Sequence, residues 1–230
     1  IRTRSFLDLV HEDDRPGVID RHLRRLSGET FDTPYILRAL RKDGAIRFMN
    51  VSGVTIQWEG RPATLNFFAD ITARVQAEAK IEFQAYHDPL TGLPNRTLFA
   101  DRLNLALARA RRHREPIAVL YADLDHLKRV NDTLGHTMGD LLLKQAALRF
   151  RALLREEDTV ARFGGDEFVI LLARVKDGTV AARVAEKIVA RMNEPMVIGE
   201  HTLRVTASVG VASWPVDGDD AETLIKNADN

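Results

Sequence analysis

The stretch 164–167, Gly-Gly-Asp-Glu, joins two glycines to two adjacent carboxylates, and apolar runs at 159–163 and 168–172 flank it. This pattern predicts a tight hairpin that presents Asp166 and Glu167 at its tip. Glycine accepts positive φ and lets a phosphate or another backbone approach closely. Neighbouring carboxylates repel each other unless a cation or a substrate proton meets them. Taken alone, the stretch is also typical of a solvated turn with incidental acids.

A further carboxylate stands at the end of a predicted buried strand. Residues 117–121 form an apolar, partly β-branched run, and Asp123 follows almost directly. If this strand lies beside the hairpin, Asp123 and Asp166 converge at one end of the sheet. Mg²⁺ commonly takes one or two carboxylates together with substrate phosphates. The two acids therefore predict a site for a divalent cation.

Several separated motifs resemble the GGDEF-domain diguanylate cyclases in order and spacing. They are the nine residues Asp-Pro-Leu-Thr-Gly-Leu-Pro-Asn-Arg at 88–96, the segment from Asp123 to Asp140, and Gly-Gly-Asp-Glu-Phe at 164–168. The resemblance runs from residue 88 to the end of the chain. It implies an α+β fold, a palm-like nucleotidyl-cyclase (ferredoxin-like) GGDEF domain with a mainly antiparallel sheet.

The apolar periodicity of this part of the chain predicts helices interleaved with strands. The predicted segments are helices at 98–114, 139–154, 181–192 and from near Ala221, a strand at 117–122, and a β-rich run at 202–213 after a turn at Gly199-Glu200.

By this resemblance, the chain condenses two GTP molecules into cyclic di-GMP and pyrophosphate. The resemblance implies two Mg²⁺ or Mn²⁺ ions per active site, held by the carboxylates of Asp123 and Asp166 and the main-chain carbonyl of Leu124. Such ions neutralise phosphates and hold the attack in line. Glu167 is expected as the base or a metal partner near the 3′-hydroxyl. Lys128 is expected to counter phosphate charge as a mobile cation.

Four further residues are assigned to GTP recognition. Guanine presents N1–H and N2–H side by side, and Asp140 offers two acceptors to match, beside the amide of Asn131. Adenine reverses the donor pattern and would leave Asp140 unpaired. His136 is expected to line the same pocket, and Arg162 to contact a phosphate. Taken singly, they are also typical of a helix-start acid, a turn asparagine, a turn-shaping Gly-His pair and an exposed strand-end arginine.

Arg155 and Asp158 resemble the product-binding inhibitory site of the same family, because their Arg-x-x-Asp spacing ends five residues before Gly164. Arginine can fork onto a phosphate or a guanine edge, and Asp158 can accept from guanine N–H groups. This implies that cyclic di-GMP is an inhibitor as well as the product. The alternative is a salt bridge between the two residues at a helix end.

Residues 1–70 predict a separate, small α+β module. Its expected elements are helices at 5–10 and 14–26, strands at 33–41, 45–57 and 63–69, and turns at Asp43-Gly44 and Glu59-Gly60. Segments 9–15, 41–44 and 68–72 resemble the C-terminal half of a PAS sensor domain, whose opening strands have no counterpart here. No cofactor is expected for this partial PAS module.

Residues 71–87 predict a helical linker to the GGDEF domain at 88–230, whose C-terminus is expected to be truncated. The apolar spacing of the linker only loosely fits a heptad. A dimeric coiled coil that transmits the sensor state and a plain amphipathic helix both remain open.

The composition of the chain limits the kinds of partner that we expect it to bind. The 33 basic and 33 acidic residues balance, which argues against nucleic acid as a partner. The chain has no cysteine, so it has neither disulfides nor thiolate chemistry. No apolar stretch is long enough to span a bilayer, so we expect a cytoplasmic segment without direct membrane contact. Because the chain begins at Ile1 and ends inside a predicted helix, we expect a fragment of a longer protein, which could be membrane-anchored elsewhere.

Three functions compete. The first is a homodimeric, sensor-linked diguanylate cyclase with product feedback inhibition. The second is a GTP-binding regulatory GGDEF domain that controls a C-terminal EAL-type cyclic di-GMP phosphodiesterase. The third is a purely structural dimerisation module. The presence of Glu167 beside Asp166 favours the enzyme, because a binding domain has less need of a base.

Overall fold

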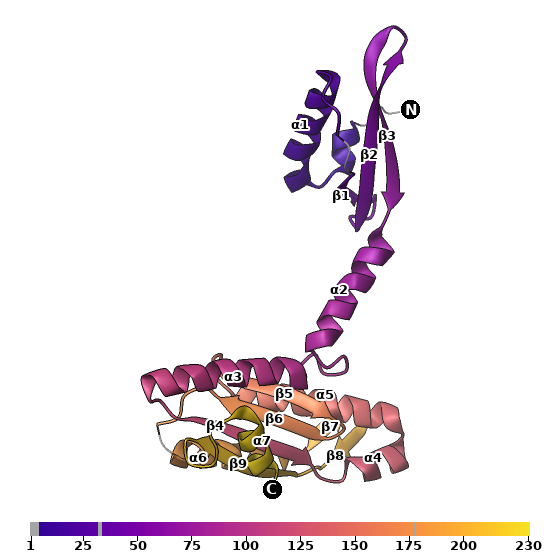
Figure 1. Cartoon of the computed structure of the whole chain (residues 1–230). Coiled ribbons are helices and arrows are strands. Elements are labelled where there is room, and N and C mark those ends of the chain that lie inside the picture. The colour runs from indigo at the N-terminus through magenta and orange to yellow at the C-terminus, as the bar shows by residue number, and fades with distance from the viewer. Residues whose placement is uncertain (1–4, 32–33, 177) are drawn as a thin grey trace. The chain divides into compact units, whose positions relative to one another are not determined.

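The computed structural model describes residues 5–31, 34–176 and 178–230. The chain divides into two compact units, Ile1–Ile81 and Glu82–Asn230 (Figure 1). Helix α2 (Thr72–Tyr86) crosses this boundary, so the helix predicted at the linker is confirmed. No helix within the described ranges combines the length and the apolar character that crossing a membrane requires.

The N-terminal unit packs short helices on an antiparallel meander, as predicted. Two 3-10 turns, Phe6–Leu9 and Glu12–Asp14, lead into α1 (Arg15–Leu26). Three strands follow and are neighbours in the sheet in chain order, namely β1 (Tyr35–Leu40), β2 (Ile46–Trp58) and β3 (Arg61–Asp70). The predicted start of the first strand, residue 33, lies outside the described residues. A small core of Val10, Val18, Leu37 and Val51 joins the helices to the sheet.

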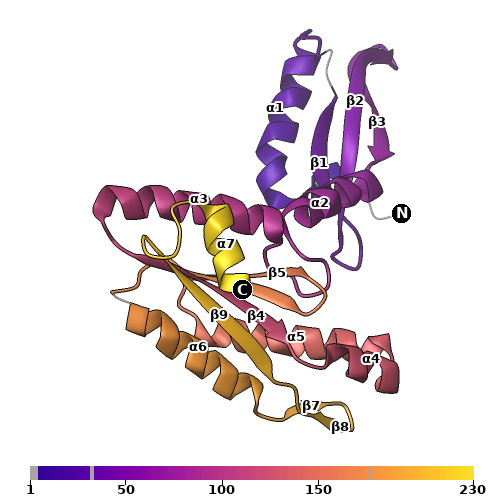
Figure 2. The same cartoon turned by 60° about the horizontal axis from the view of Figure 1, so that its bottom comes forward.

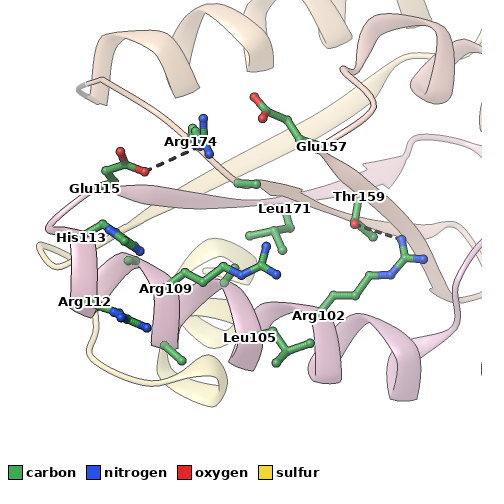
Figure 3. A pocket seen from close by; sticks show the side chains of 14 residues that line it. Arg102, Leu105, Arg109, Arg112, His113, Glu115, Glu157, Thr159, Leu171 and Arg174 are labelled. Atoms are coloured by element: carbon green, nitrogen blue, oxygen red, sulfur yellow. Dashed lines mark hydrogen bonds and ion pairs between the residues drawn. The ribbon is translucent and has the colours of Figure 1, made fainter.

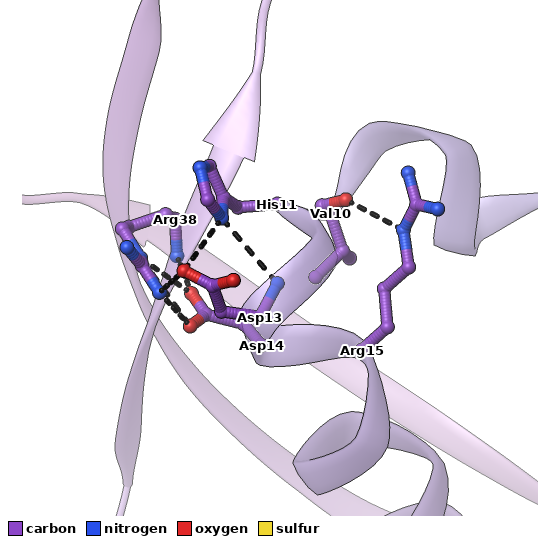
Figure 4. A network of polar contacts seen from close by, with 6 residues as sticks. All are labelled: Val10, His11, Asp13, Asp14, Arg15 and Arg38. Atoms are coloured by element: carbon purple, nitrogen blue, oxygen red, sulfur yellow. Dashed lines mark hydrogen bonds and ion pairs between the residues drawn. The ribbon is translucent and has the colours of Figure 1, made fainter.

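An ion-pair network fixes the turn before α1 against β1 (Figure 4). Arg38 donates from Nη2 to Asp14 Oδ1 at 2.6 Å and from its main-chain nitrogen to Asp14 Oδ2 at 2.7 Å. The same Nη2 lies 3.1 Å from Asp13 Oδ2. The hydrogen bonds from Arg38 outweigh burial and lower the pKa of Asp14. The acids of segment 9–15 therefore stabilise the fold of this unit.

The C-terminal unit is built on a four-stranded antiparallel sheet in the order β5-β6-β4-β9. Its strands are β4 (Ile117–Leu124), β5 (Thr159–Gly164), β6 (Glu167–Leu172) and β9 (Ala207–Trp214), and a small hairpin adds β7 (Met196–Ile198) and β8 (His201–Leu203). Its helices are α3 (Arg96–His113), α4 (Leu127–Leu134), α5 (His136–Leu153), α6 (Gly178–Met192) and α7 (Ala221–Asp229). The predicted α+β class and mainly antiparallel sheet are confirmed.

Helices cover both faces of this sheet (Figure 2). Helices α5 and α6 pack on the face of Leu120, Phe168 and Ile170. Helices α3 and α7 pack on the opposite face, around Val119 and Val169. This sandwich explains why β4 reads as a continuous apolar run, since both of its faces are buried.

Several predicted boundaries differ from the structure, and one helix was not predicted. The helix predicted from residue 139 begins at His136, and α4 before it was not predicted. Gly135, with φ of 83°, separates the two helices. The β-rich run at 202–213 is divided, because residues 204–206 lie outside β8 and β9. Eight-residue helices and three-residue strands are shorter than the window over which periodicity predicts an element from sequence.

Candidate active site

The Gly-Gly-Asp-Glu stretch forms the predicted hairpin between β5 and β6. Gly164 and Gly165 have φ of 148° and 48°, a backbone that other residues adopt only with strain. Asp123 of β4 pairs in register with Glu167 of β6. The N–H of Leu124 donates to the carbonyl of Asp166 at 3.2 Å. The strand pairing therefore brings Asp123, Asp166 and Glu167 to one end of the sheet.

Several acidic side chains surround Asp123 at this end of the sheet. Burial raises the pKa of Asp123, and repulsion from Asp166, Asp125, Glu167 and Asp229 raises it further. Among the described residues, no three histidine or acidic side chains are grouped so as to hold a metal by themselves. The arrangement fits an ion that takes few protein carboxylates and completes its shell from other oxygens, as Mg²⁺ does. The side chain of Leu124 has no ligand atom, so only its main-chain carbonyl could contribute.

Two residues without a predicted role complete this end of the sheet. Tyr121 lies two residues before Asp123; burial, together with a hydrogen bond to Glu167, raises the pKa of its phenol. Opposite Tyr121 on β9 stands Gly210, where a Cβ would lie 2.0 Å from the carbonyl oxygen of Ala228. This glycine lets the end of α7 approach the sheet, which brings Asp229 into the field of Asp123. The only sequence signal is a glycine inside a β-rich run.

A buried ion pair between Arg162 and Asp88 stabilises the hairpin that carries Asp166. Arg162 Nη1 lies 3.0 Å from Asp88 Oδ1, and Arg162 Nη2 donates to the carbonyl of Gly165 at 2.7 Å. Burial alone would raise the pKa of Asp88, but hydrogen bonds from Thr91 and Arg162 lower it overall. The Arg162 side chain is only 10% exposed, so its interpretation as an exposed strand-end arginine is wrong. Segment 88–96 thereby holds the loop that carries Asp166.

The residues assigned to guanine lie on α4 and α5. Asn131 is helical rather than in a turn, and Asp140 follows the first turn of α5 rather than starting the helix. A Cβ at Gly139 would lie 1.9 Å from Asn131 Oδ1, so this glycine leaves room for the asparagine. The packing places the Asn131 amide next to the segment that bears Asp140. His136 is the exposed first residue of α5, and Lys128 is exposed in the first turn of α4.

Arg155 and Asp158 lie in the connection from α5 to β5. Asp158 accepts from the main-chain N–H of Arg155 at 3.1 Å and from that of Ala173 at 3.2 Å. The Arg155 side chain is 71% exposed and lies 3.8 Å from Glu157. The alternative of a salt bridge between Arg155 and Asp158 is therefore wrong, since Asp158 holds the turn and Arg155 faces solvent.

A basic cavity of about 910 Å³ lies beside this connection, between α3 and the β5–β6 pair (Figure 3). Arg102, Arg109 and Arg174 line it, together with the acidic residues Glu115 and Glu157. Arg102 is tied to the sheet by a hydrogen bond from Nη1 to Thr159 Oγ1 at 3.1 Å. Arg109 and Arg112, near the C-terminal end of α3, thus contribute to the lining of this cavity.

Comparison with known proteins gives the class of this site. The family described as "Diguanylate cyclase, GGDEF domain" matches residues 85–230. The chain therefore belongs to the GGDEF diguanylate cyclase family, as the motifs predict.

Individual proteins similar to this chain also belong to this family of cyclases. Diguanylate cyclase TpbB of Pseudomonas aeruginosa is 45% identical over 159 residues, which are 68% of this chain and 37% of TpbB. The bifunctional diguanylate cyclase/cyclic di-GMP phosphodiesterase MucR of the same species is 46% identical over 158 residues, 69% of this chain and 23% of MucR. The chain thus spans well under half the length of these relatives.

Solved structures show the same fold. The crystal structure of the TpbB GGDEF domain matches with a TM-score of 0.60 and 44% identity, covering 60% of this chain and 87% of that one. The coiled coil and GGDEF domain of DgcB from Caulobacter crescentus, in complex with c-di-GMP, match with a TM-score of 0.59 and 27% identity, covering 68% and 84%.

Proposed function

We propose that this chain condenses two molecules of GTP into cyclic di-GMP and releases pyrophosphate. The observation that carries the proposal is the convergence of Asp123, Asp166 and Glu167 at one sheet end, where burial and mutual repulsion raise the pKa of Asp123. Asp88, which supports the hairpin, is paired with the Arg162 guanidinium instead. Uncompensated acids at a glycine hairpin suit a site that receives a cation and a polyphosphate.

The residues present fit Mg²⁺ or Mn²⁺, because hard cations prefer carboxylate oxygens. Asp123, Asp166 and the carbonyl of Leu124 would hold the metal, two ions per active site. Such ions supply charge neutralisation on the phosphates. Glu167, oriented by Tyr121, accepts the proton of the attacking 3′-hydroxyl. Lys128 offers a mobile cation to the phosphates.

Base selection rests on α4 and α5. Asp140 accepts the two N–H donors of guanine, and the Asn131 amide, seated over Gly139, reaches the neighbouring edge. His136 lines the entrance beside them. ATP is expected to be a poor substrate, because adenine would leave Asp140 without a donor.

Each chain carries one GTP, so the reaction needs a homodimer. The N-terminal unit acts in this proposal as a partial PAS sensor module without a cofactor, and α2 links it to the catalytic unit.

Cyclic di-GMP inhibits by binding at Arg155 and Asp158, and the exposure of Arg155 supports this role. Arg155→Ala is expected to relieve product inhibition while sparing turnover, measured as initial rates with added cyclic di-GMP. Unchanged inhibition would contradict the assignment.

The test of the activity is a turnover assay on the full chain with GTP and Mg²⁺. We expect cyclic di-GMP and pyrophosphate from the unmodified chain and none from Asp166→Ala. Asp101→Ala, which removes an exposed carboxylate from α3, is the matched control and should keep full activity. Equal turnover by Asp166→Ala and Asp101→Ala would contradict the assignment of the site.

A second function is a GTP-binding regulatory domain that controls a C-terminal EAL-type phosphodiesterase. The observation in its favour is the relative MucR, whose name joins both activities and of which this chain matches 23%. The two proposals separate in one experiment. GTP binding without any product in the presence of Mg²⁺ favours the regulatory domain, whereas product formation favours the cyclase.

A further inference from the structure

Arg96, the first residue of α3, is an exposed cation without an assigned role in the proposed reaction. Within the described part of the chain, its guanidinium forms no ion pair. The first turn of α3 contains no acidic residue, and the positive end of a helix dipole disfavours a cation there. The stability of the helix therefore gives no reason for a cation at this position.

The guanidinium of Arg96 lies against the strand that leads into the Gly-Gly hairpin. Its Cζ is 4.6 Å from the centre of the Phe163 ring, within the range of a cation–π contact. Phe163 directly precedes Gly164, and its ring meets the ring of Tyr121 edge-on, with 6.2 Å between the ring centres. Tyr121 in turn is hydrogen-bonded to Glu167. A continuous series of contacts therefore joins the Arg96 cation to Glu167.

Hydrogen bonds hold the start of α3 in this place. Asn95 Oδ1 accepts from the N–H of Leu98 at 3.1 Å, which caps the helix and fixes the main chain at Arg96. The N–H of Arg162 in β5 donates to the carbonyl of Pro94 at 3.0 Å. The start of α3 is thus tied to the strand before the hairpin, while the side chain of Arg96 stays exposed to a substrate.

We propose that Arg96 is a further catalytic residue, which contacts the α-phosphate of the second GTP. This inference rests on the proposed cyclase function. In that reaction the 3′-oxygen of one GTP bonds to the α-phosphorus of the other, and the 3′-hydroxyl proton passes to Glu167. The bond from that phosphorus to pyrophosphate breaks. The attacked α-phosphate must therefore approach Glu167, on the side where Arg96 lies, and a seated guanidinium stabilises the charge of its oxygens in the transition state.

Steady-state kinetics of Arg96→Met with GTP and Mg²⁺ test the proposal. We expect kcat to fall about 100-fold, the usual cost of removing one donor from a transition-state oxyanion. Affinity for 3′-deoxy-GTP, which lacks the attacking hydroxyl, should stay unchanged, because Arg96 contacts the GTP of the other copy only in the assembled site. Arg96→Lys keeps the charge without the planar fork and should recover part of the rate.

The matched control is Arg183→Met, which alters an exposed arginine of α6, on the opposite face of the sheet. It should change neither kcat nor the affinity for 3′-deoxy-GTP. Circular dichroism should show the same fold in both variants, because both side chains are exposed.

Three results would overturn the proposal. The first is a kcat of Arg96→Met equal to that of Arg183→Met. The second is a loss of rate that disappears at high protein concentration, which would assign Arg96 to the association of two copies. The third is a loss of 3′-deoxy-GTP affinity as large as the loss of kcat, which would assign Arg96 to the GTP of its own chain. An unmodified chain that forms no cyclic di-GMP would overturn the cyclase proposal as well, whereas each of the three results leaves that proposal standing.

Discussion

Asp88 and Asp123 are both partly buried aspartates near the same hairpin, yet their electrostatic surroundings are opposite. Asp88 receives hydrogen bonds from Thr91 and Arg162, which outweigh burial and lower its pKa. Asp123 faces other acids, and burial and repulsion both raise its pKa. The same residue type thus stabilises the fold at one place and is left unpaired at the other. An unpaired acid cluster held by a well-paired support is what a cation-dependent site requires.

The comparison also separates the roles of the motifs. Segment 88–95 and Arg162 fix the position of the hairpin, whereas Asp123, Asp166 and Glu167 carry the chemistry in the proposed reaction. Variants of the first group should act mainly on stability. Variants of the second group should act mainly on turnover.

The largest effect on stability is expected for Arg162→Met, which leaves Asp88 buried without its partner. Breaking a buried ion pair on one side costs about 3 kcal/mol of the free energy of unfolding. Arg174→Met removes the arginine of an exposed pair with Glu115 and should change it by less than about 1 kcal/mol. Urea denaturation of both variants measures the difference. Equal losses would show that the buried pair does not support the hairpin.

A smaller effect, confined to substrate binding, is expected for Gly139→Ala. The added methyl collides with Asn131 Oδ1, so we expect GTP affinity to fall about tenfold, which corresponds to about 1.4 kcal/mol. Gly178→Ala is the control, because nothing lies within 4 Å of a Cβ at that helical glycine. Equilibrium binding of GTP measures both. Unchanged affinity in Gly139→Ala would remove Asn131 from the guanine site.

The smallest effect is the acid sensitivity that Asp88 confers. Its pKa in the folded chain lies below the ordinary value of 3.8, so its stabilising contribution is present above that pH and is lost as pH falls through the folded pKa. The stability difference between the chain and Asp88→Asn should therefore shrink on acidification below pH 3.8. Unfolding free energies over this pH range measure it. A difference that grows on acidification would contradict the pairing of Asp88.

Local chemistry made part of this architecture predictable. The hairpin at Gly164 follows from glycine conformation, and β4 from an apolar run, so the approach of Asp123 to Asp166 could be expected before the structure. Helix α4 could not, because its apolar positions Leu127, Val130 and Leu134 span only eight residues, a window too short for periodicity to distinguish a helix from a loop.

Long-range contacts were also beyond sequence reasoning. The pair of Arg162 with Asp88 joins residues 74 positions apart, and no local pattern indicates it. The field of Asp229 at Asp123 depends on the close packing of α7 over Gly210. In the sequence, Arg25 is likewise indistinguishable from the other arginines of its helix, and only the structure shows that it is buried. In each case tertiary packing, rather than residue type, decides the role.

The most direct test of the account is the free energy of unfolding of Asp123→Asn without divalent cations, measured against pH. Because the folded pKa of Asp123 is raised, its ionisation costs stability as pH rises above 3.8. The account predicts that Asp123→Asn is more stable than the unmodified chain at neutral pH, by about 0.5–2 kcal/mol. When Mg²⁺ and GTP are added, the variant should produce no cyclic di-GMP, whereas the unmodified chain should. The stability difference should close as pH falls toward 3.8. A variant that is less stable at neutral pH, or that still turns over GTP, would contradict the account.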